Sequence, residues 1–353
     1  MSVVTFLIGN GFDLACGLKS KYKDTYNGYI NSVSPSDVIK KFKKNIEKNI
    51  DTWADFEMKI AEYAKNFEKG EDLVTCIRDY KVYLIDYLKK EQAKFHNSFN
   101  PNSGDSIQKM IYLLLYFYKD IRPNDQDAIS SELSDGAERI LQFISFNYTD
   151  VFDTLEKSAF EFIEDKYKYY VDKDVVHIHG DLNNNADIVL GIDNESQFCK
   201  LPYGLNRSFR RTTIKPTWLE GFCRKRKEQA LSYIKSSNVI CAFGLSLGES
   251  DLTWRQAVAE WLLDNPKHHL VFFNHNLVAK SASETDVTER EDIADAKNEE
   301  LLKILFKNKG VDNNKLTSLS AQIHIPVGYT KFDLSNIVNI DQNPIGRATV
   351  DYR

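Results

Sequence analysis

The chain opens with Val3-Val4-Thr5-Phe6-Leu7-Ile8-Gly9-Asn10-Gly11-Phe12-Asp13-Leu14. Its apolar run of six residues ends in a Gly-Asn-Gly turn before a segment that can start a helix, which predicts a strand, a tight turn and a helix. Glycines let the backbone bend sharply and approach a ligand, and the amides that start a helix favour a phosphate. Gly-Asn-Gly also forms ordinary turns, so this stretch alone leaves a phosphate site and a plain turn open.

The composition is typical of a soluble globular protein, with 353 residues of which 42% are hydrophobic and 27% are charged. This length allows one large domain or two of ordinary size. The net charge of −5 gives no support to a nucleic acid as partner. No apolar run approaches the roughly 18 residues of a membrane span, and residues 1–8 lack the charged region of a signal peptide. We therefore expect a cytoplasmic protein with no membrane partner.

Five cysteines are scattered along the chain without any Cys-x-x-Cys pair. This spacing does not fit a zinc site, so we expect no metal. An odd number of cysteines without an export signal predicts free thiols. The five are Cys16, Cys76, Cys199, Cys223 and Cys241.

Residues 35–137 have a helical period almost throughout. Apolar side chains recur every three or four residues, which predicts helices with one packing face. These stripes are Phe56, Ile60, Tyr63 and Phe67, then Ile77, Tyr80, Leu84 and Tyr87, then Ile107, Ile111, Leu114 and Tyr118. We interpret residues 31–137 as a helical insertion in an α/β domain formed by residues 1–30 and 138–335, with a polar tail at 336–353.

Within the insertion, Trp53-Ala54-Asp55-Phe56-Glu57 places two carboxylates and a large ring within one helical turn. Asp55 could equally be a first-turn acid that complements the helix dipole, and we favour this structural interpretation. The sequence does not show whether Trp53, Asp55 and Glu57 face a pocket.

Further runs predict strands between helices. Several are continuously apolar, which is typical of strands buried on both faces of a parallel sheet. They are residues 142–147, 174–179, 188–191, 238–244, 269–274 and 322–326, with helical stretches at 219–236 and 253–264. The predicted fold is therefore α/β and Rossmann-like, a doubly wound and mostly parallel sheet with an α-helical insertion.

Polar residues follow four of the predicted strands. In an open α/β sheet, ligands bind outside the carboxyl ends of the strands, so we expect these residues to meet at one ligand site. Taken singly, each could be a helix cap, a structural histidine or a turn. The four groups are Gly9-Asn10-Gly11 with Asp13, Asn147-Tyr148-Thr149-Asp150, His179-Gly180-Asp181 and Gly244-Leu245-Ser246-Leu247.

This arrangement resembles the sirtuin-like (SIR2-like) NAD-binding fold, whose first turn is Gly-Ala-Gly-Ile-Ser followed at a fixed distance by Gly-Ile-Pro. The matching residues are Gly9, Gly11, Gly17 and Leu18, then Asn147 of the Asn-x-Asp motif, His179-Gly180 of the catalytic His-Gly, and Gly244-Leu245-Ser246 of the late Gly-Thr-Ser. Thr149 stands where the Asn-x-Asp motif has its acid. The four-cysteine zinc module of sirtuin deacylases has no counterpart. The resemblance thus implies machinery that holds NAD and breaks its nicotinamide bond.

A closer resemblance is to the AbiH family of bacteriophage abortive-infection proteins, whose N-terminal run is Ile-Gly-Asn-Gly-Phe-Asp-Leu. The chain has Ile8-Gly9-Asn10-Gly11-Phe12-Asp13-Leu14, Gly17-Leu18, Ser20, Tyr22, Trp53-Ala54-Asp55-Phe56-Glu57, Phe146-Asn147-Tyr148-Thr149 and His177-Ile178-His179-Gly180. This resemblance implies a defence protein that stops the growth of an infected cell, through a phage-derived trigger.

We expect His179 to act as a base near neutral pH and Asn147 to orient water and ribose. Gly9, Asn10 and Gly11 are expected to hold the pyrophosphate through backbone N–H groups, with Asp13 near the ribose. The other expected contacts of NAD are Phe12, Tyr148, Thr149, Gly180, Gly244, Ser246 and Asn274. We choose His179 over His177 as the inward-facing histidine because it lies beside Gly180, although two residues spaced by two on a strand share a face.

Three functions remain open. The one we favour is hydrolysis of NAD at its nicotinamide–ribose bond. A non-catalytic sensor of NAD or ADP-ribose would use the glycine turn without a base, with the helical insertion as its interaction surface. An ADP-ribosyl or nucleotide transferase would use the same residues with another acceptor. A homo-oligomer is compatible with each.

Overall fold

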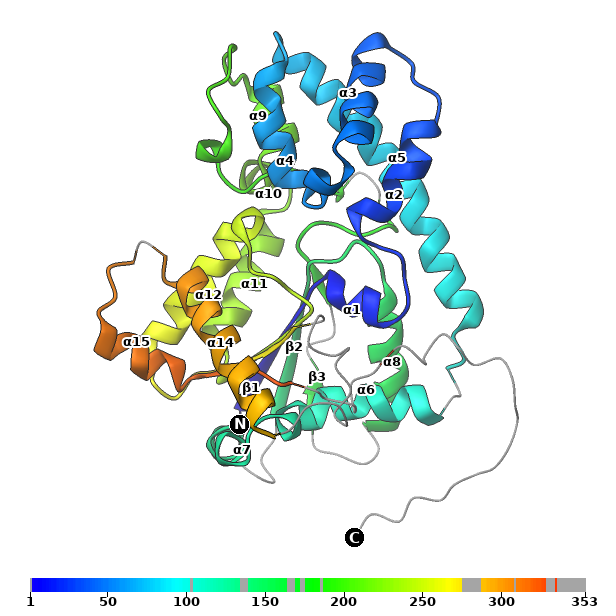
Figure 1. Ribbon diagram of the computed structural model, residues 1–353. Coiled ribbons are helices and arrows are strands. Elements are labelled where there is room, and N and C mark those ends of the chain that lie inside the picture. Colours follow the sequence, from blue (N-terminus) through cyan, green and yellow to red (C-terminus); the bar gives the residue numbers. More distant parts are fainter. Residues whose placement is uncertain are drawn as a thin grey trace.

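A parallel β-sheet forms the centre of the molecule (Figure 1). The computed structural model describes residues 2–101, 104–133, 139–163, 169–171, 175–184, 187–274, 287–307, 309–327 and 334. Within these residues the strands are β1 (Ser2–Ile8), β2 (Arg139–Ser145), β3 (Tyr169–Val171), β4 (Val176–His177), β5 (Val239–Phe243), β6 (His269–Phe273) and β7 (Ile323–His324). Their order is β3-β2-β1-β5-β6-β7, and β4 pairs with β2 beyond the end of β3. The predicted doubly wound α/β fold is confirmed.

The strand order places a switch point between β1 and β5. From β1 the chain builds the sheet outward through β2 in one direction, and from β5 through β6 and β7 in the other. Ile8 pairs with both Ser145 and Phe243, so β1, β2 and β5 end at the same level. The residues that follow these three strands therefore leave the sheet side by side. In doubly wound sheets this position is where ligands bind.

Helices cover both faces of the sheet, which explains why its strands are continuously apolar. One face packs on α1 (Asn10–Ala15), α6 (Gly104–Tyr116), α7 (Pro123–Leu133) and α8 (Val151–Ile163). The other packs on α11 (Arg224–Ser236), α12 (Leu252–Asp264), α14 (Val287–Leu305) and α15 (Asn313–Ser320). Along β1 the side chains alternate, with Phe6 in the first core and Leu7 in the second.

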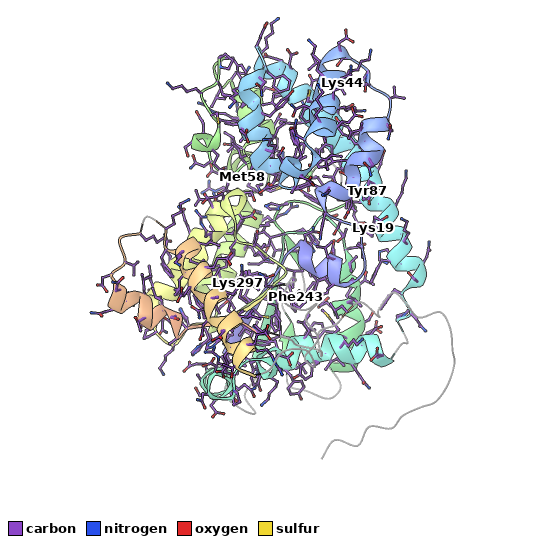
Figure 2. The ribbon with its side chains drawn as sticks, viewed as in Figure 1. Lys19, Lys44, Met58, Tyr87, Phe243 and Lys297 are labelled. Atoms are coloured by element: carbon purple, nitrogen blue, oxygen red, sulfur yellow. The ribbon has the colours of Figure 1, made fainter. Side chains whose placement is uncertain are left out.

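A second group of helices lies beyond the carboxyl ends of the strands, at the top of Figure 1. It comprises α2 (Tyr22–Asn31), α3 (Asp37–Lys48), α4 (Phe56–Tyr63), α5 (Gly70–Ser98) and α9 (Arg207–Thr213), which we call the helical module. Its core combines aliphatic and aromatic side chains, with Phe56 stacked on Tyr80 at 4.2 Å between ring centroids. Figure 2 shows Met58 of α4 at the edge of the module that faces the α/β domain.

The helical region predicted at 31–137 divides between these two groups. Its first two apolar stripes pack mainly in the core of the helical module, whereas Ile111, Leu114 and Tyr118 of the third pack on or beside the sheet. The module also takes in apolar residues from later in the chain, including Leu182, Ile188 and Phe209. The module is therefore assembled from two distant parts of the sequence.

Several predicted elements differ from the structure. Residues 188–191 are not a strand: Val189 N–H donates to the His179 carbonyl at 2.9 Å, and Ile188 and Leu190 enter the core of the helical module. The helix predicted at 219–236 is two helices, α10 (Lys215–Phe222) and α11, separated by Cys223. The strand predicted at 174–179 is reduced to β4, and that at 322–326 to β7. The tail at 336–353 lies outside the described residues.

Two expectations about the whole chain can be compared with the fold. All five cysteines are free, as predicted. Within the described ranges, no helix combines the length and the apolar character that crossing a bilayer requires.

Candidate functional site

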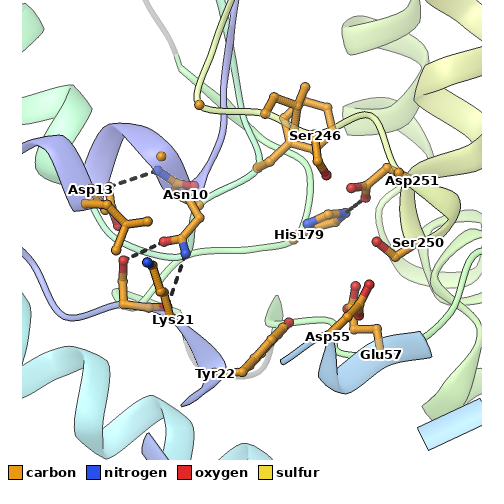
Figure 3. A pocket seen from close by; sticks show the side chains of 18 of the residues that line it. Asn10, Asp13, Lys21, Tyr22, Asp55, Glu57, His179, Ser246, Ser250 and Asp251 are labelled. Carbon is orange, nitrogen blue, oxygen red and sulfur yellow. Dashed lines mark hydrogen bonds and ion pairs between the residues drawn. The ribbon is translucent and has the colours of Figure 1, made fainter. Parts of the chain in front are cut away.

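A pocket of about 720 Å³ opens at the carboxyl ends of the strands, between the sheet and the helical module. Its volume lies within the range of roughly 300 to 1,000 Å³ that is usual for small-molecule sites. The residues that line it follow β1, β2, β4, β5 and β6, or belong to the loop before α2, the start of α4, and α14. Figure 3 shows part of this lining.

Most residues that were predicted for the site lie in this lining. They are His179, Asn147, Asn10, Gly11, Asp13, Tyr148, Thr149, Gly244, Ser246 and Asn274. Gly9, Phe12 and Gly180 are not part of it. The Phe12 ring instead packs edge-on against Phe152 and Phe243 in the core.

The glycine turn after β1 packs directly on the turn after β5. Gly9 N–H donates to the Phe243 carbonyl and Gly11 N–H to the Gly244 carbonyl, each at 2.9 Å. A Cβ atom at Gly9 would lie 2.6 Å from the Gly244 carbonyl oxygen. Two of the three amides expected to hold a pyrophosphate are thus bonded to backbone carbonyls. In this structure the glycines serve the close approach of two turns.

Asp13 and Asn147 join the first two strand ends by side-chain hydrogen bonds. Asn147 Nδ2 donates to Asp13 Oδ1 at 2.8 Å and to the Gly9 carbonyl at 3.1 Å, and Thr149 Oγ1 donates to Asp13 Oδ2 at 2.6 Å. Burial raises the pKa of Asp13 to about 7, against the lowering effect of these two donors. Both oxygens of Asp13 are therefore engaged within the protein. Asn147 Oδ1 accepts no hydrogen bond from the residues that the structure describes.

His177 and His179 occupy different environments, because β4 ends at His177 and His179 lies in the following turn. The sequence suggested that the two histidines share one face of a strand, but in the structure they do not. His177 Nδ1 lies 3.0 Å from the Asn147 carbonyl and Nε2 lies 3.1 Å from Asp153 on α8. Burial acts to lower the pKa of His177, but Asp153 outweighs it and the pKa is raised. His177 thus supports the backbone that carries Asn147.

His179 lies in the pocket with its Nε2 3.7 Å from Asp251 Oδ1. Burial and the nearby Lys215 ammonium lower the pKa of His179 to about 3, although Asp251 acts to raise it. The imidazole is therefore neutral at physiological pH. This differs from the expected base that titrates near neutral pH, because the sequence revealed neither the burial of His179 nor the nearby Lys215.

Lys215 is that cation, and it bridges two carboxylates. Its Nζ lies 2.8 Å from Glu57 Oε2 on α4 and 3.2 Å from Asp251 Oδ1, the last residue of the 3₁₀ helix η6 (Glu249–Asp251). All three are buried, with 2%, 6% and 8% of their surface exposed for Lys215, Glu57 and Asp251. We call them the charge cluster. Burial raises the pKa of Glu57 to about 7, while Lys215 opposes the shift.

The Trp53–Glu57 motif divides between packing and the pocket. Trp53 is buried in the core of the helical module, and its Nε1 donates to Asn45. Asp55 Oδ1 accepts from Met58 N–H at 3.0 Å, so Asp55 is the N-cap of α4 and the acid in the first turn is Glu57. Asp55 also lines the pocket, together with Glu57 of the charge cluster. One motif therefore anchors the module and supplies two carboxylates to the site.

The pocket has two differently charged sides (Figure 3). Asn10, Lys21 and the buried Asp13 lie on one side, where Asn10 Oδ1 accepts from Ser20 Oγ at 2.5 Å and the raised pKa of Asp13, about 7, reduces the negative charge of its carboxyl group. No carboxylate within the described ranges forms an ion pair with the Lys21 ammonium. Asp55 lies on the other side with His179 and the charge cluster. An elongated ligand that is anionic at one end and cationic at the other would suit this distribution of charge.

The sequence missed several residues of the pocket. No motif marks Ser250, Asp251, Lys21 and Lys297, which line the pocket, or Lys215, which does not line it but bridges Glu57 and Asp251. Lys297 of α14 is paired with Glu300 at 2.7 Å. No group of three or more potential metal ligands occurs among the residues that can be described.

Comparison with known proteins gives one family. A family model described as "Bacteriophage abortive infection AbiH" matches residues 5–273, which is more than half of the chain. The match ends with the last residue of β6, so it takes in the glycine turn, Asn147, His179 and the whole charge cluster. It does not extend to α14. Among curated proteins no match was found.

Proposed function

The chain belongs to the AbiH family of bacteriophage abortive infection, and from this premise we propose that it defends against phage by binding and hydrolysing NAD. The family indicates the defence role. The NAD-binding site that we propose is the pocket at the switch point, with a sirtuin-like arrangement of strand ends. The bond to be broken is the one between nicotinamide and ribose. A phage-derived trigger would start the reaction, and loss of NAD would stop the growth of the infected cell.

The single observation that carries this proposal is the meeting of four separate strand ends in one pocket. Gly11, Asn147, His179 and Gly244 come from different parts of the sequence, yet all line the same cavity. They correspond in order to the four motifs of the sirtuin-like resemblance. Position supports the proposal as well, because dinucleotides bind at the switch point of doubly wound sheets.

The charge on the two sides of the pocket supports a substrate of this class. NAD carries an anionic pyrophosphate and, at its other end, a cationic nicotinamide ring. Lys21 lies on the side suited to the phosphates, and Asp55 and Asp251 lie on the side suited to the ring. Asp251 is buried, so it would attract a positive charge more strongly than it would in water, whereas Lys21 and Asp55 are exposed.

The proposed reaction consumes one water and releases one proton. The C1′–N bond breaks, its electron pair returns to the nicotinamide ring, and nicotinamide leaves as a neutral molecule. A water oxygen then bonds to C1′ of the oxocarbenium-like ribose, giving ADP-ribose. Because the leaving group needs no protonation, stabilisation of positive charge matters more than a strong base. Asp251 supplies the negative charge for this, and its carboxylate also lies beside His179.

The neutral imidazole of His179 fits a modest role in this reaction. A histidine with a pKa of about 3 accepts a proton weakly, but its ring can hold a water or a ribose hydroxyl by a hydrogen bond. Asn147 Oδ1 offers a second acceptor in the same pocket. Together the two would orient the attacking water, which would lose its proton to solvent.

One observation favours a second candidate, a non-catalytic sensor of NAD or ADP-ribose. A histidine with a pKa of about 3 is neutral at physiological pH, and a neutral His179 suits ligand binding. A sensor needs no proton transfer. Such a sensor would bind its ligand in the same pocket. The helical module would be the surface through which it interacts with a partner.

The test is to incubate the purified protein with NAD and to measure free nicotinamide and ADP-ribose by chromatography. We expect His179→Gln and Asn147→Ala to reduce turnover at least about tenfold, because each removes a group that would orient water or ribose. His96→Gln is the matched control, since this half-exposed histidine pairs with Asp150 outside the pocket. Turnover that survives both pocket substitutions would contradict the site.

The remaining functions give different results in the same assay. Tight binding of NAD by the purified protein without nicotinamide release would support the sensor, if phage-infected cells show no nicotinamide release either. Nicotinamide release without free ADP-ribose would indicate transfer to an acceptor. Toxicity on overexpression that is lost in His179→Gln would support hydrolysis inside the cell.

A further inference from the structure

The charge cluster and His179 together join four separate segments of the chain at one point. Glu57 belongs to the helical module, Lys215 begins α10, Asp251 ends η6 and His179 follows β4. Lys215 Nζ lies between the two carboxylates, and Asp251 Oδ1 is also the carboxylate atom that faces His179 Nε2. Lys215 does not line the pocket, so its side chain acts on the site from behind.

A cluster of this kind is costly to bury. Removing an ammonium and two carboxylates from water costs several kcal/mol per ion, and their attraction repays this only when the geometry is good. Replacing such groups by apolar residues is often neutral or stabilising. Stability alone therefore does not explain a lysine that is 2% exposed beside the pocket.

We propose that Lys215 is a positioning residue of the site: it bridges Asp251, the carboxylate that faces His179, to Glu57 of the helical module, and so makes the charge around His179 depend on the seating of the module. The inference deepens the proposed function and takes from it the identity of the site. Glu57 is fixed in turn by the Gly191 N–H, which donates to its Oε1 at 3.1 Å. The cluster thus links the module to the side of the pocket that holds His179.

The charged groups around His179 lead to a measurable prediction about its pKa. Lys215 and Asp251 are the charges that act on its imidazole, and the Phe146 main chain is its hydrogen-bond partner. The rings of Phe146 and Tyr148 lie beside it, with centroids 5.7 and 6.4 Å away. With Lys215 in place the positive charge resists protonation of His179. Without it, the Asp251 carboxylate favours protonation, so the pKa of His179 rises.

The experiment follows His179 by NMR in the full chain with isotope-labelled histidine and no ligand, across a range of pH from acidic to neutral. His179→Gln identifies the resonance. The test variant is the double substitution Lys215→Met and Glu57→Gln, which removes one positive and one negative charge together. Lys215→Arg keeps the positive charge. Lys43→Met is the matched control, because Lys43 is a buried lysine of the helical module that donates to Ser32 and Val33 and does not line the pocket.

We expect the midpoint of the pH titration of His179 to rise by about 1 to 3 pH units in the double variant, since a neighbouring charge has an effect of that size. It should stay at its original value in Lys215→Arg and Lys43→Met, and His177 should not change in any variant. A folded double variant whose His179 titrates as in the parent would overturn the proposal. If the double variant does not fold, Lys215→Gln with Glu57→Gln replaces the ion pair by an amide pair and gives the same comparison.

This test is independent of NAD. A protein that fails to hydrolyse NAD would contradict the proposed function and leave the titration result unchanged. An unchanged titration in a protein that hydrolyses NAD would contradict only the role of Lys215.

Discussion

The two sides of the pocket are built in different ways. On the side of the glycine turn, Gly9, Gly11 and Gly244 bring two backbone turns into contact, and Asp13 and Asn147 are joined by hydrogen bonds. On the side of the charge cluster, ions from the module, α10 and η6 meet around His179. The first side depends on shape and short-range geometry, and the second on charges that are buried together.

This difference has consequences for how each side tolerates change. Close backbone packing cannot accommodate an added atom, whereas an ionic cluster can lose a balanced pair of charges and keep its shape. The glycine side should therefore respond to small changes in volume. The charge cluster should respond to changes in charge and pH.

The largest expected effect in this comparison comes from Gly244→Ala. Gly244 has φ +64°, and a Cβ atom there would lie 2.4 Å from Gly11 Cα. Left-handed strain and the backbone clash together should reduce the free energy of unfolding by about 2 to 4 kcal/mol. Chemical denaturation measures this change, and calorimetric titration should show weaker NAD binding.

Gly221→Ala on α10 is the control for this prediction, because a Cβ atom at Gly221 would have no neighbour within 4 Å among the described residues. It should leave stability unchanged or raise it slightly, as alanine favours a helix. Equal stability of Gly244→Ala and Gly221→Ala would show that the two turns can separate without cost.

The fold could be predicted from the sequence to a large extent because its signals are local. The apolar runs of β1, β5 and β6 mark strands buried on both faces, and the turn after Ile8 is visible in two glycines. The prediction of a strand at residues 188–191 was wrong because an extended apolar segment can be buried without joining a sheet. Val189 bonds to a turn, and Ile188 and Leu190 pack in the helical module, which periodicity does not distinguish from a strand.

The residues of the site that follow strands could be predicted, but Lys215 and Asp251 of the charge cluster could not. Asn147, His179 and the glycine turn follow strands directly, so the topology of the sheet brings them together. Lys215 and Asp251 belong to no motif, and their proximity depends on how the start of α10 packs beside η6. Spacing along the chain gives no information on such contacts. The pKa of His179 was unpredictable for the same reason, since it depends on the burial of the imidazole and then on Lys215.

A second prediction concerns the pH dependence of the glycine side. Burial raises the pKa of Asp13 from 3.8 to about 7, so the folded protein holds this proton more tightly than the unfolded chain. The contribution of Asp13 to the free energy of unfolding is therefore largest below about pH 4. It decreases as the pH rises toward 7, by about 1.4 kcal/mol per pH unit at most. Asp13→Asn mimics the protonated acid. It should therefore gain stability relative to the parent between about pH 4.5 and pH 7.5.

Denaturation midpoints of both proteins, measured with the same denaturant at several pH values, test this slope. The amide introduced by Asp13→Asn can still accept from Asn147 Nδ2 and donate to Thr149 Oγ1, so the local structure should be kept. A stability difference that stays constant across this pH range would show that Asp13 stays ionised in the fold.

The smallest expected effect separates structure from ligand binding at Asp55. Its carboxylate caps α4 and also lines the cationic-ring side of the proposed NAD site. Asp55→Ala should cost about 1 kcal/mol of stability, whereas Asp55→Ser should cost little, because serine also caps a helix. If the charge acts on the nicotinamide ring, both variants should lose affinity for NAD⁺ by up to about fivefold, while NADH, whose ring is neutral, should bind them as it binds the parent. Weaker binding of both nucleotides in the alanine variant alone would mean that Asp55 serves the site only by holding the start of α4 in place.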